Sequence, residues 1–249
     1  MLKNRESYAY DLGENIQEIM NDVIKGYSPP SAGRSAVEYE DEITGAISSR
    51  IETDLTIDSD NYAILPDTHN GVTEQETGAD LAILYNVDTA DISLQTGVLM
   101  QAKRYESGYY NADNNDWSKL VDQCEKMLKY STDSYVIDYS MKENGIYLIP
   151  AVSVAGTSSS TLDDFDNDSW LPQKYHRRKP GEVIKPLFLG FLGSEYVYQF
   201  LSKTESSVPD FRRTDDLEHP DPIYTDGAGE VEEERQIQIV NVTVKDKEQ

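Results

Sequence analysis

The chain has 249 residues, of which 22 are Lys or Arg and 46 are Asp or Glu, so its formal net charge is −24 at pH 7. Hydrophobic residues make up 38% of it, which is enough for a packed core. No apolar run approaches the ~20 residues that span a bilayer, residues 1–20 lack the apolar region of a signal peptide, and a single cysteine excludes a disulfide framework or a multi-cysteine zinc site. We therefore expect a cytoplasmic protein with no membrane partner.

The acidity bears on nucleic-acid binding in two opposite ways. A charge of −24 repels nucleic acid in dilute buffer, so composition alone argues against a DNA-binding role. The acidic residues are spread along the chain, however, and Asp outnumbers Glu, which is similar to proteins of salt-accumulating haloarchaea. Molar salt screens charges beyond about 3 Å, so a halophilic surface of this kind is compatible with a locally basic cleft. The alternative interpretation is an ordinary acidic protein.

Hydrophobic spacing predicts two N-terminal helices. Residues 7–27 form the first, which ends near Gly26 before a Pro-containing break at 28–31. Residues 35–53 form the second, in which Ile43, Ile47 and Ile51 recur every four residues and define a buried stripe. The stretch 58–78 is polar and contains Pro66 and the turn signal Asn70–Gly71, so we expect a turn there.

The middle of the chain predicts a strand pair, a helix and a second strand pair. The first pair is 79–86 and 97–104, joined through a turn at 88–91. A helix is expected over 116–130, followed by strands at 134–139 and 145–154 with a hairpin turn between them.

The C-terminal part is less regular. An acidic patch at 163–168 and a basic run at 174–179 precede the most apolar segment, 187–201, which we expect to pack as a helix on the core or to serve as a dimer face. Loop is expected over 204–234 and a last strand over 236–244. The element order predicts an α/β or α+β fold with a mixed sheet. We divide the chain into an N-terminal helix (1–30), a core (35–155) and a C-terminal extension packed on it (156–249).

The informative constellation is Asp80 with the triplet Gln101-Ala102-Lys103. Side chains alternate along a strand, so Gln101 and Lys103 share one face while Ala102 points to the other. If the two strands pair, Asp80 falls opposite the triplet, and a carboxylate, an amide and an ammonium converge. This set suits metal-assisted phosphodiester hydrolysis, in which oxygen ligands hold Mg²⁺ and the lysine assists water and offsets developing charge.

A further carboxylate is expected from the helix at 35–53. Glu40 falls in the middle of the isoleucine stripe, where a glutamate is costly unless it faces a cleft or a metal. Glu42 lies near the border of the stripe and is the reserve. The alternative is that Glu40 only complements the helix dipole in the first turn.

These motifs together resemble the PD-(D/E)XK nuclease superfamily. The resemblance rests on Glu40 and Thr44 in a helix, Ala79-Asp80 opening a strand, and Gln101-Ala102-Lys103 closing the next, over about half of the chain. It implies a restriction-endonuclease-like fold, in which a mixed central sheet is flanked by helices, with a C-terminal elaboration.

The resemblance also implies roles for single residues. Asp80 would bind Mg²⁺ or Mn²⁺, Gln101 would occupy the usual acidic position, and the Ala102 carbonyl would be a further ligand. Lys103 would be the catalytic lysine, and Glu40 would complete the site. Gln123, in the helix that follows, is an auxiliary residue that could face the active site. Glu74 and Glu76 could add to a metal cluster or lie on the surface.

The basic run is the candidate DNA-binding segment. It contributes Lys174, Arg177, Arg178 and Lys179, with Arg104 as a helper. The alternative role for the run is to neutralise the acidic patch at 163–168.

The sequence thus predicts a Mg²⁺-dependent deoxyribonuclease connected with restriction or defence, with DNA as partner and either a second copy or a separate subunit for specificity. Two alternatives stay open: a catalytically silent member of the same fold that binds DNA or protein, and an assembly protein of a mobile element. The Gln at the acidic position and the acidic surface favour the silent member.

Overall fold

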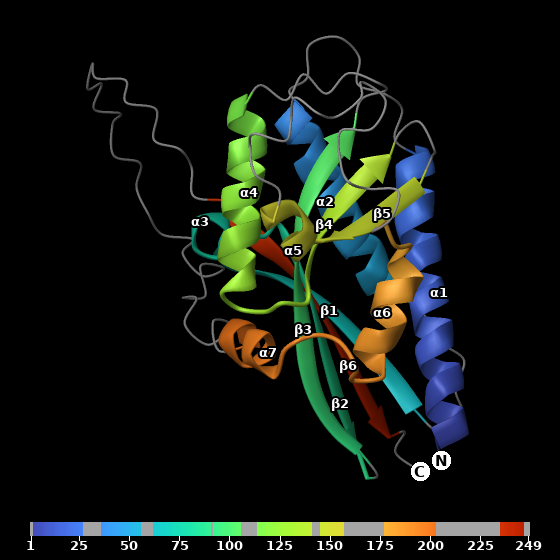
Figure 1. Cartoon of the computed structure of the whole chain (residues 1–249). Helices are drawn as coiled ribbons and strands as arrows, with labels where there is room; N and C mark the ends of the chain where they lie inside the picture. The colour runs from blue at the N-terminus through green and yellow to red at the C-terminus, as the bar shows by residue number, and fades with distance from the viewer. Residues whose placement is uncertain are drawn as a thin grey trace, which may run out of the picture.

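The fold is a mixed six-stranded sheet with helices on both faces (Figure 1). The computed structural model describes residues 2–26, 36–55, 62–90, 92–105, 114–140, 145–156, 177–202 and 235–246. Its strands are β1 (Tyr62–Thr73), β2 (Leu81–Thr89), β3 (Ile92–Tyr105), β4 (Ser134–Ser140), β5 (Gly145–Pro150) and β6 (Gln236–Asp246). Its helices are α1 (Leu2–Gly26), α2 (Ala36–Asp54), α3 (Glu74–Thr77), α4 (Asn114–Leu128), α5 (Ala151–Ala155), α6 (Pro180–Phe188) and α7 (Glu195–Ser202). The expected α/β class with a mixed central sheet is confirmed.

The strand order is β1-β6-β2-β3-β4-β5. The expected hairpin forms, because β2 and β3 pair antiparallel from Leu81↔Met100 to Thr89↔Ile92. Strand β3 pairs parallel with β4, and β4 antiparallel with β5. The C-terminal strand β6 lies between β1 and β2, antiparallel to the first and parallel to the second. The last strand therefore completes the sheet that the hairpin begins.

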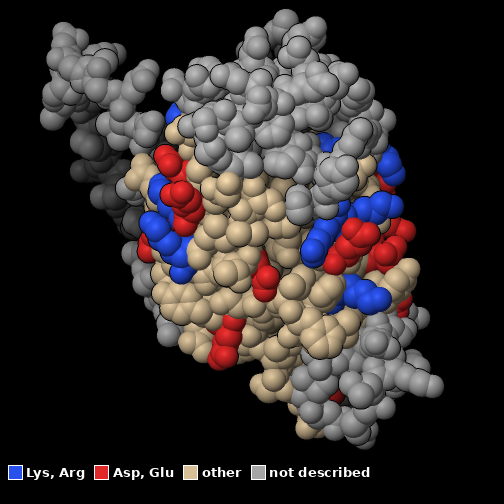
Figure 2. Space-filling model, in the orientation of Figure 1, with Lys and Arg blue, Asp and Glu red and all other residues tan. Residues whose placement is uncertain are grey.

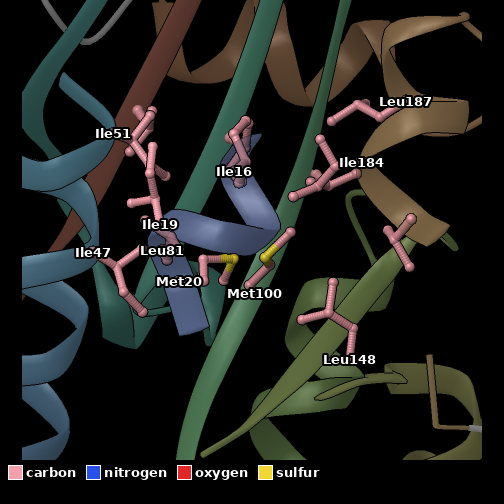
Figure 3. Close-up of a cluster of buried hydrophobic side chains, with 14 of the residues drawn as sticks. Ile16, Ile19, Met20, Ile47, Ile51, Leu81, Met100, Leu148, Ile184 and Leu187 are labelled. Atoms are coloured by element: carbon pink, nitrogen blue, oxygen red, sulfur yellow. The ribbon is translucent and has the colours of Figure 1, made fainter. Parts of the chain in front are cut away.

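Two hydrophobic layers enclose the sheet. On one face, α1, α2 and α6 pack against residues such as Leu81 and Met100 of the hairpin (Figure 3). On the other face, α4, α5 and α7 pack against Ala82 and Leu99, the neighbours of those residues in sequence. Because side chains alternate along a strand, each hairpin residue can be assigned to one layer. Asp80, Gln101 and Lys103 belong by this alternation to the face covered by α4.

The expected helices form where hydrophobic spacing places them. Ile43, Ile47 and Ile51 are all fully buried, as the stripe on α2 predicts. Leu120 and Cys124 of α4 are also buried, in the layer on the opposite face. The spacing thus identifies the buried side of each helix.

Three local expectations are wrong. The polar stretch 58–78, in which a turn was expected, contains β1, and the turn signal Asn70–Gly71 coincides with a shift of register between Asn70 and Thr73. The expected helix 187–201 is divided between α6 and α7, with Gly190 and Gly193 at positive φ between them. The expected strand 145–154 ends at Pro150, where α5 begins.

Among the described helices, none has the length and apolar character needed to cross a membrane.

Candidate functional site

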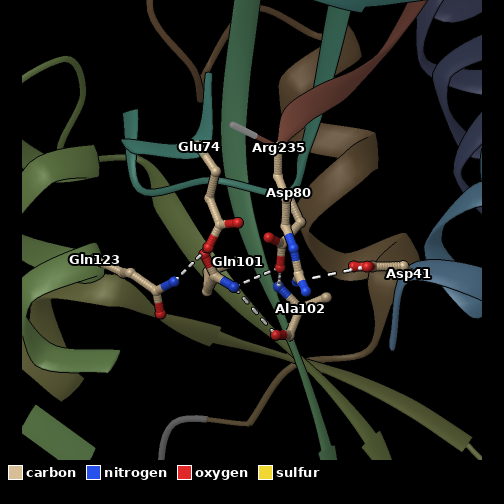
Figure 4. A network of polar contacts seen from close by, with 7 residues as sticks. All are labelled: Asp41, Glu74, Asp80, Gln101, Ala102, Gln123 and Arg235. Carbon is tan, nitrogen blue, oxygen red and sulfur yellow. Dashed lines mark hydrogen bonds and ion pairs between the residues drawn. The ribbon is translucent and has the colours of Figure 1, made fainter. Parts of the chain in front are cut away.

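The site lies at the start of β2. Beyond this point β3 no longer pairs with β2 and pairs only with β4. Leu81 and Met100 form the last β2–β3 pair, and the Asp80 N–H still donates to the Met100 carbonyl at 2.9 Å. The next β3 amide that points toward β2 is that of Ala102. It lies beyond the last β2–β3 residue pair, so β2 offers it no backbone acceptor. The Asp80 carboxylate takes that place, because its Oδ2 accepts the Ala102 N–H at 2.7 Å. The end of the ladder therefore fixes the position of this carboxylate (Figure 4).

Gln101 lies beside Asp80, as the pairing predicts. Its side chain is only 1% exposed, and its Nε2 donates to Asp80 Oδ2 and, at 3.3 Å, to the Ala102 carbonyl. Its Oε1 is buried and has no hydrogen-bond partner. Two of the oxygens expected as metal ligands, Asp80 Oδ2 and the Ala102 carbonyl oxygen, thus accept hydrogen bonds from one amide nitrogen.

Lys103 lies on the same face, two residues further along β3. It is half-buried and is the register partner of Asp138 on β4. Asp138 is fully buried and accepts a hydrogen bond from Arg177 Nη2 at 2.5 Å. The Arg177 guanidinium also lies 4.8 Å from the centre of the Tyr147 ring. The candidate lysine therefore neighbours a buried carboxylate that sequence reasoning missed. The signal was an Asp within the apolar strand 134–139.

The two glutamates of α2 that the sequence proposes for the site are not seen in contact with Asp80 among the interactions that the structure describes. Glu40 lies in α2, but its side chain is outside the described residues, and Glu42 is exposed. The buried stripe of α2 packs on the face opposite to Asp80, where Thr44 Oγ1 lies 3.0 Å from the Tyr139 hydroxyl. The assignment of Glu40 and Glu42 to the site stays a prediction.

The candidate DNA-binding residues fall into three groups. Lys174 and the acidic patch at 163–168 are outside the described residues, as is the side chain of Arg104. Arg178 and Lys179 are exposed next to α6, on a flank where Figure 2 shows basic and acidic side chains interspersed. Arg177 is bound to Asp138 and so has a structural contact in addition to its predicted one.

A second polar pair lies next to Asp80 and Gln101. Gln123 of α4 donates from Nε2 to Glu74 Oε1 at 2.6 Å, and its assignment to the active site stays a prediction. Arg235, just before β6, forms an ion pair of 3.5 Å with Asp41 of α2 at the rim (Figure 4). Nothing in the sequence singles out Arg235, because its position depends on where β6 enters the sheet.

Gly78 explains how this second pair forms. It closes α3 at φ +74°, and its N–H donates to the Glu74 carbonyl at 2.7 Å. A Cβ at this position would lie 2.4 Å from the Gln123 carbonyl oxygen, so only glycine lets α4 approach so closely. The glycine before Ala79-Asp80 thus serves the packing of α4.

The donor set fits a hard divalent cation. Asp80, Gln101 and Ala102 offer carboxylate, amide and carbonyl oxygens, the ligand types of Mg²⁺ and Mn²⁺. The buried Gln101 Oε1 has no donor, as expected of an oxygen that serves as a ligand. In the described part of the chain no three His, Cys, Asp or Glu side chains gather to hold a metal, so a site here depends on neutral oxygens.

Comparison with known proteins yields no match: no family model, no curated protein and no solved structure matches this chain.

Proposed function

We propose that the protein is a divalent-cation-dependent deoxyribonuclease of the restriction-endonuclease-like kind. The observation that carries the proposal is the contact at the end of the β2–β3 hairpin. There the Asp80 carboxylate binds the Ala102 amide, Gln101 lies beside it, and Lys103 follows on the same face of the sheet. The mixed sheet with helices on both faces supports the same proposal.

Each residue of the site has a role in this proposal. Asp80, the Gln101 amide and the Ala102 carbonyl would hold Mg²⁺ or Mn²⁺. When bound, such a cation supplies Lewis-acid polarisation of the phosphodiester and a water of lowered pKa. The Lys103 ammonium orients the attacking water and stabilises the negative charge that develops on the phosphate. Glu40, with Glu42 in reserve, is the proposed further carboxylate.

The proposed partner is DNA. Arg178 and Lys179 are exposed cations that can contact phosphates, and we assign the same role to Lys174, Arg177 and Arg104. Such contacts position the protein on DNA and carry no sequence information, so recognition would come from a second copy or a separate subunit.

The test is cleavage of supercoiled plasmid in about 1 M KCl, with and without Mg²⁺ or Mn²⁺. Lys103→Ala is compared with Lys119→Ala, which removes an exposed lysine of α4. Asp80→Asn, which keeps an acceptor for the Ala102 amide, is compared with Asp88→Asn on the exposed end of β2. We expect cleavage that requires the cation, a roughly 10²–10⁴-fold loss in the two site variants, and no change in the two controls.

Two outcomes would contradict the proposal. One is a folded wild-type protein that leaves supercoiled, linear and single-stranded DNA intact with either cation. The other is cleavage that survives both site substitutions, since the activity would then belong to another site or to a contaminant.

A catalytically silent binding protein of the same fold is the second candidate. The Gln101 amide donates to Asp80 and so occupies a carboxylate oxygen with a neutral group, which favours this candidate. Absence of any effect of Mg²⁺ or Mn²⁺ on the protein, together with salt-resistant binding of DNA or of a protein, would select it over the enzyme.

A further inference from the structure

Glu74 is a carboxylate that the candidate site holds but that the proposed mechanism does not use. It begins α3 and is half-buried, while its neighbour in the same short helix, Glu76, is exposed. Figure 4 shows the side chains of Glu74, Gln101 and Gln123 converging from α3, β3 and α4. Glu74 is therefore an acidic side chain that points toward the surroundings of Asp80.

Three contacts fix the position of Glu74. Its N–H donates to the Arg235 carbonyl at 2.8 Å, and its carbonyl accepts the Gly78 N–H at 2.7 Å. Its carboxylate accepts a hydrogen bond from Gln123 Nε2 at 2.6 Å. The close approach of Gln123 to Gly78 makes this last contact possible. The carboxylate is thus held from the backbone and from its tip, as a preorganised ligand requires.

Two buried amide oxygens without a hydrogen-bond partner lie beside the Asp80 and Glu74 carboxylates. The Gln101 Nε2 donates to Asp80 and to the Ala102 carbonyl, and the Gln123 Nε2 donates to Glu74. The Oε1 atoms of Gln101 and Gln123 are both buried and both lack a hydrogen-bond partner. Buried acceptors without donors are rare unless water or an ion satisfies them. Several oxygen acceptors of which some are anionic are the ligand set of a hard divalent cation.

We propose that Glu74, held by Gln123, supplies the second carboxylate of a divalent-cation site at Asp80 and so replaces the acid that Gln101 leaves out. The inference rests on the proposed function, because it deepens the cation site of that function. It assigns the extra carboxylate to α3, whereas the resemblance assigns it to Glu40 of α2. Gln123 is a positioning residue, since it acts through the Glu74 carboxylate.

The test measures binding of Mn²⁺ to the full chain by calorimetry in the absence of DNA. Glu74→Gln keeps the size of the side chain and a partner for Gln123 but removes the charge. Glu74→Asp keeps the charge but withdraws the carboxylate by one methylene. Glu76→Gln, two residues away in the same helix, removes the same charge from an exposed position. Gln123→Leu removes the hydrogen bond to Glu74.

We expect one bound Mn²⁺ in the wild type, at least tenfold weaker binding in Glu74→Gln and Glu74→Asp, and unchanged binding in Glu76→Gln. Gln123→Leu is expected to weaken binding several-fold with Glu74 intact. Wild-type affinity in Glu74→Gln overturns the inference, as does wild-type affinity in Glu74→Asp, because long-range attraction alone would then explain the charge effect. Absence of binding to the wild type overturns it as well.

These results are separable from the fate of the nuclease proposal. If Mn²⁺ binding depends on Glu74 and plasmid stays intact, the result supports the cation site and contradicts the nuclease proposal. If the wild type cuts plasmid and Glu74→Gln cuts it and binds Mn²⁺ as the wild type does, the result supports the nuclease proposal and contradicts the role of Glu74. A thermal melt of each variant shows that it is folded under the conditions of the titration.

Discussion

The thiol of Cys124 shows how strongly the layer beside the candidate site is shielded from water. Cys124 is fully buried on α4, and burial raises the pKa of its thiol from 9.0 to about 12. The Lys103 ammonium lowers the thiol pKa and the Glu125 carboxylate raises it, but both effects are smaller than burial. Cys124 is therefore a core residue, as its place on the apolar side of the helix predicts.

Because of this thiol, the free energy of unfolding depends on pH in the alkaline range. Below pH 9 the thiol is neutral in both the folded and the unfolded chain, so its full contribution to stability is present. Between pH 9 and about 12 only the unfolded chain loses the proton, so stability falls as the pH rises. The loss amounts to about 1.4 kcal/mol between pH 8 and pH 10.

The measurement compares the free energy of unfolding of wild type and Cys124→Ala at pH 8 and at pH 10. Tyr and Lys residues titrate in both proteins and cancel in the difference. We expect the advantage of the wild type over Cys124→Ala to shrink by about 1.4 kcal/mol over this range. A difference that is the same at both pH values would mean that the thiol ionises as readily in the fold as outside it.

At the level of elements, the hairpin and the helices around it could be predicted because their signals are local. The alternation in β2 and β3 is enough to place Asp80, Gln101 and Lys103 on one face. The spacing of Ile43, Ile47 and Ile51 is enough to define the buried side of α2. Each of these inferences depends on residues that are neighbours in the chain or across one short turn.

The sequence analysis did not predict strand β1, because this stretch contains residues that are typical of turns. Pro66 has no N–H to donate, and Asn70–Gly71 is a common turn pair. Strand β1 is at the edge of the sheet, however, and pairs only with β6. An edge strand tolerates a proline on its open side. The interruption at Asn70 then appears as a shift in register instead of a chain reversal.

The place of β6 depends on contacts between residues far apart in the sequence. Its alternation predicts a strand at 236–244, and the structure confirms one from Gln236 to Asp246. That it lies between β1 and β2 is decided by packing, because Val240 and Ile239 enter opposite hydrophobic layers. The same non-local pairing brings Arg235 to Glu74 and to Asp41. The sequence does name Glu74 and Gln123 as candidates, but the arrival of Arg235 beside Glu74 was not predictable from the spacing of motifs.

The docking of residues 177–178 on the sheet is the element-level feature that offers a test. Arg178 pairs with Leu148 through two backbone hydrogen bonds, of 2.8 and 2.9 Å, at the edge of β5. Next to it, Arg177 binds the fully buried Asp138. A buried carboxylate that loses its partner is costly, whereas an exposed ion pair contributes little.

Arg177→Met is therefore expected to lower the free energy of unfolding by about 3 kcal/mol. Arg50→Met, which breaks the exposed pair with Asp54 on α2, should lower it by less than about 1 kcal/mol. Asp138→Asn in the Arg177→Met background should recover most of the loss, because the buried charge that Arg177 compensates is gone. Urea unfolding of the four proteins measures these values. A loss at Arg177 no larger than that at Arg50 would contradict a structural role for the pair.

At the scale of the whole molecule, one sheet unites the parts into which the sequence was divided. The C-terminal extension supplies α6, α7 and β6, and β6 lies inside the sheet instead of on its surface. Helix α1 packs with α6 and α2 in one hydrophobic layer. A protein of this kind should unfold as one unit, so its stability reports on all of its charges together.

The net charge of −24 then predicts how stability responds to salt. Repulsion among like charges opposes the compact state, and its range falls from about 10 Å in 0.1 M salt to about 3 Å in 1 M salt. We expect the midpoint of thermal unfolding to rise steadily from 0.1 to 2 M KCl.

Sodium chloride should act in the same way, because screening depends on ionic strength. Sucrose at matched osmolality is the control, since it screens no charge. A midpoint that does not rise with KCl, or that sucrose raises equally, would leave the protein as an ordinary acidic one and remove the reason to assay its nuclease activity in molar salt.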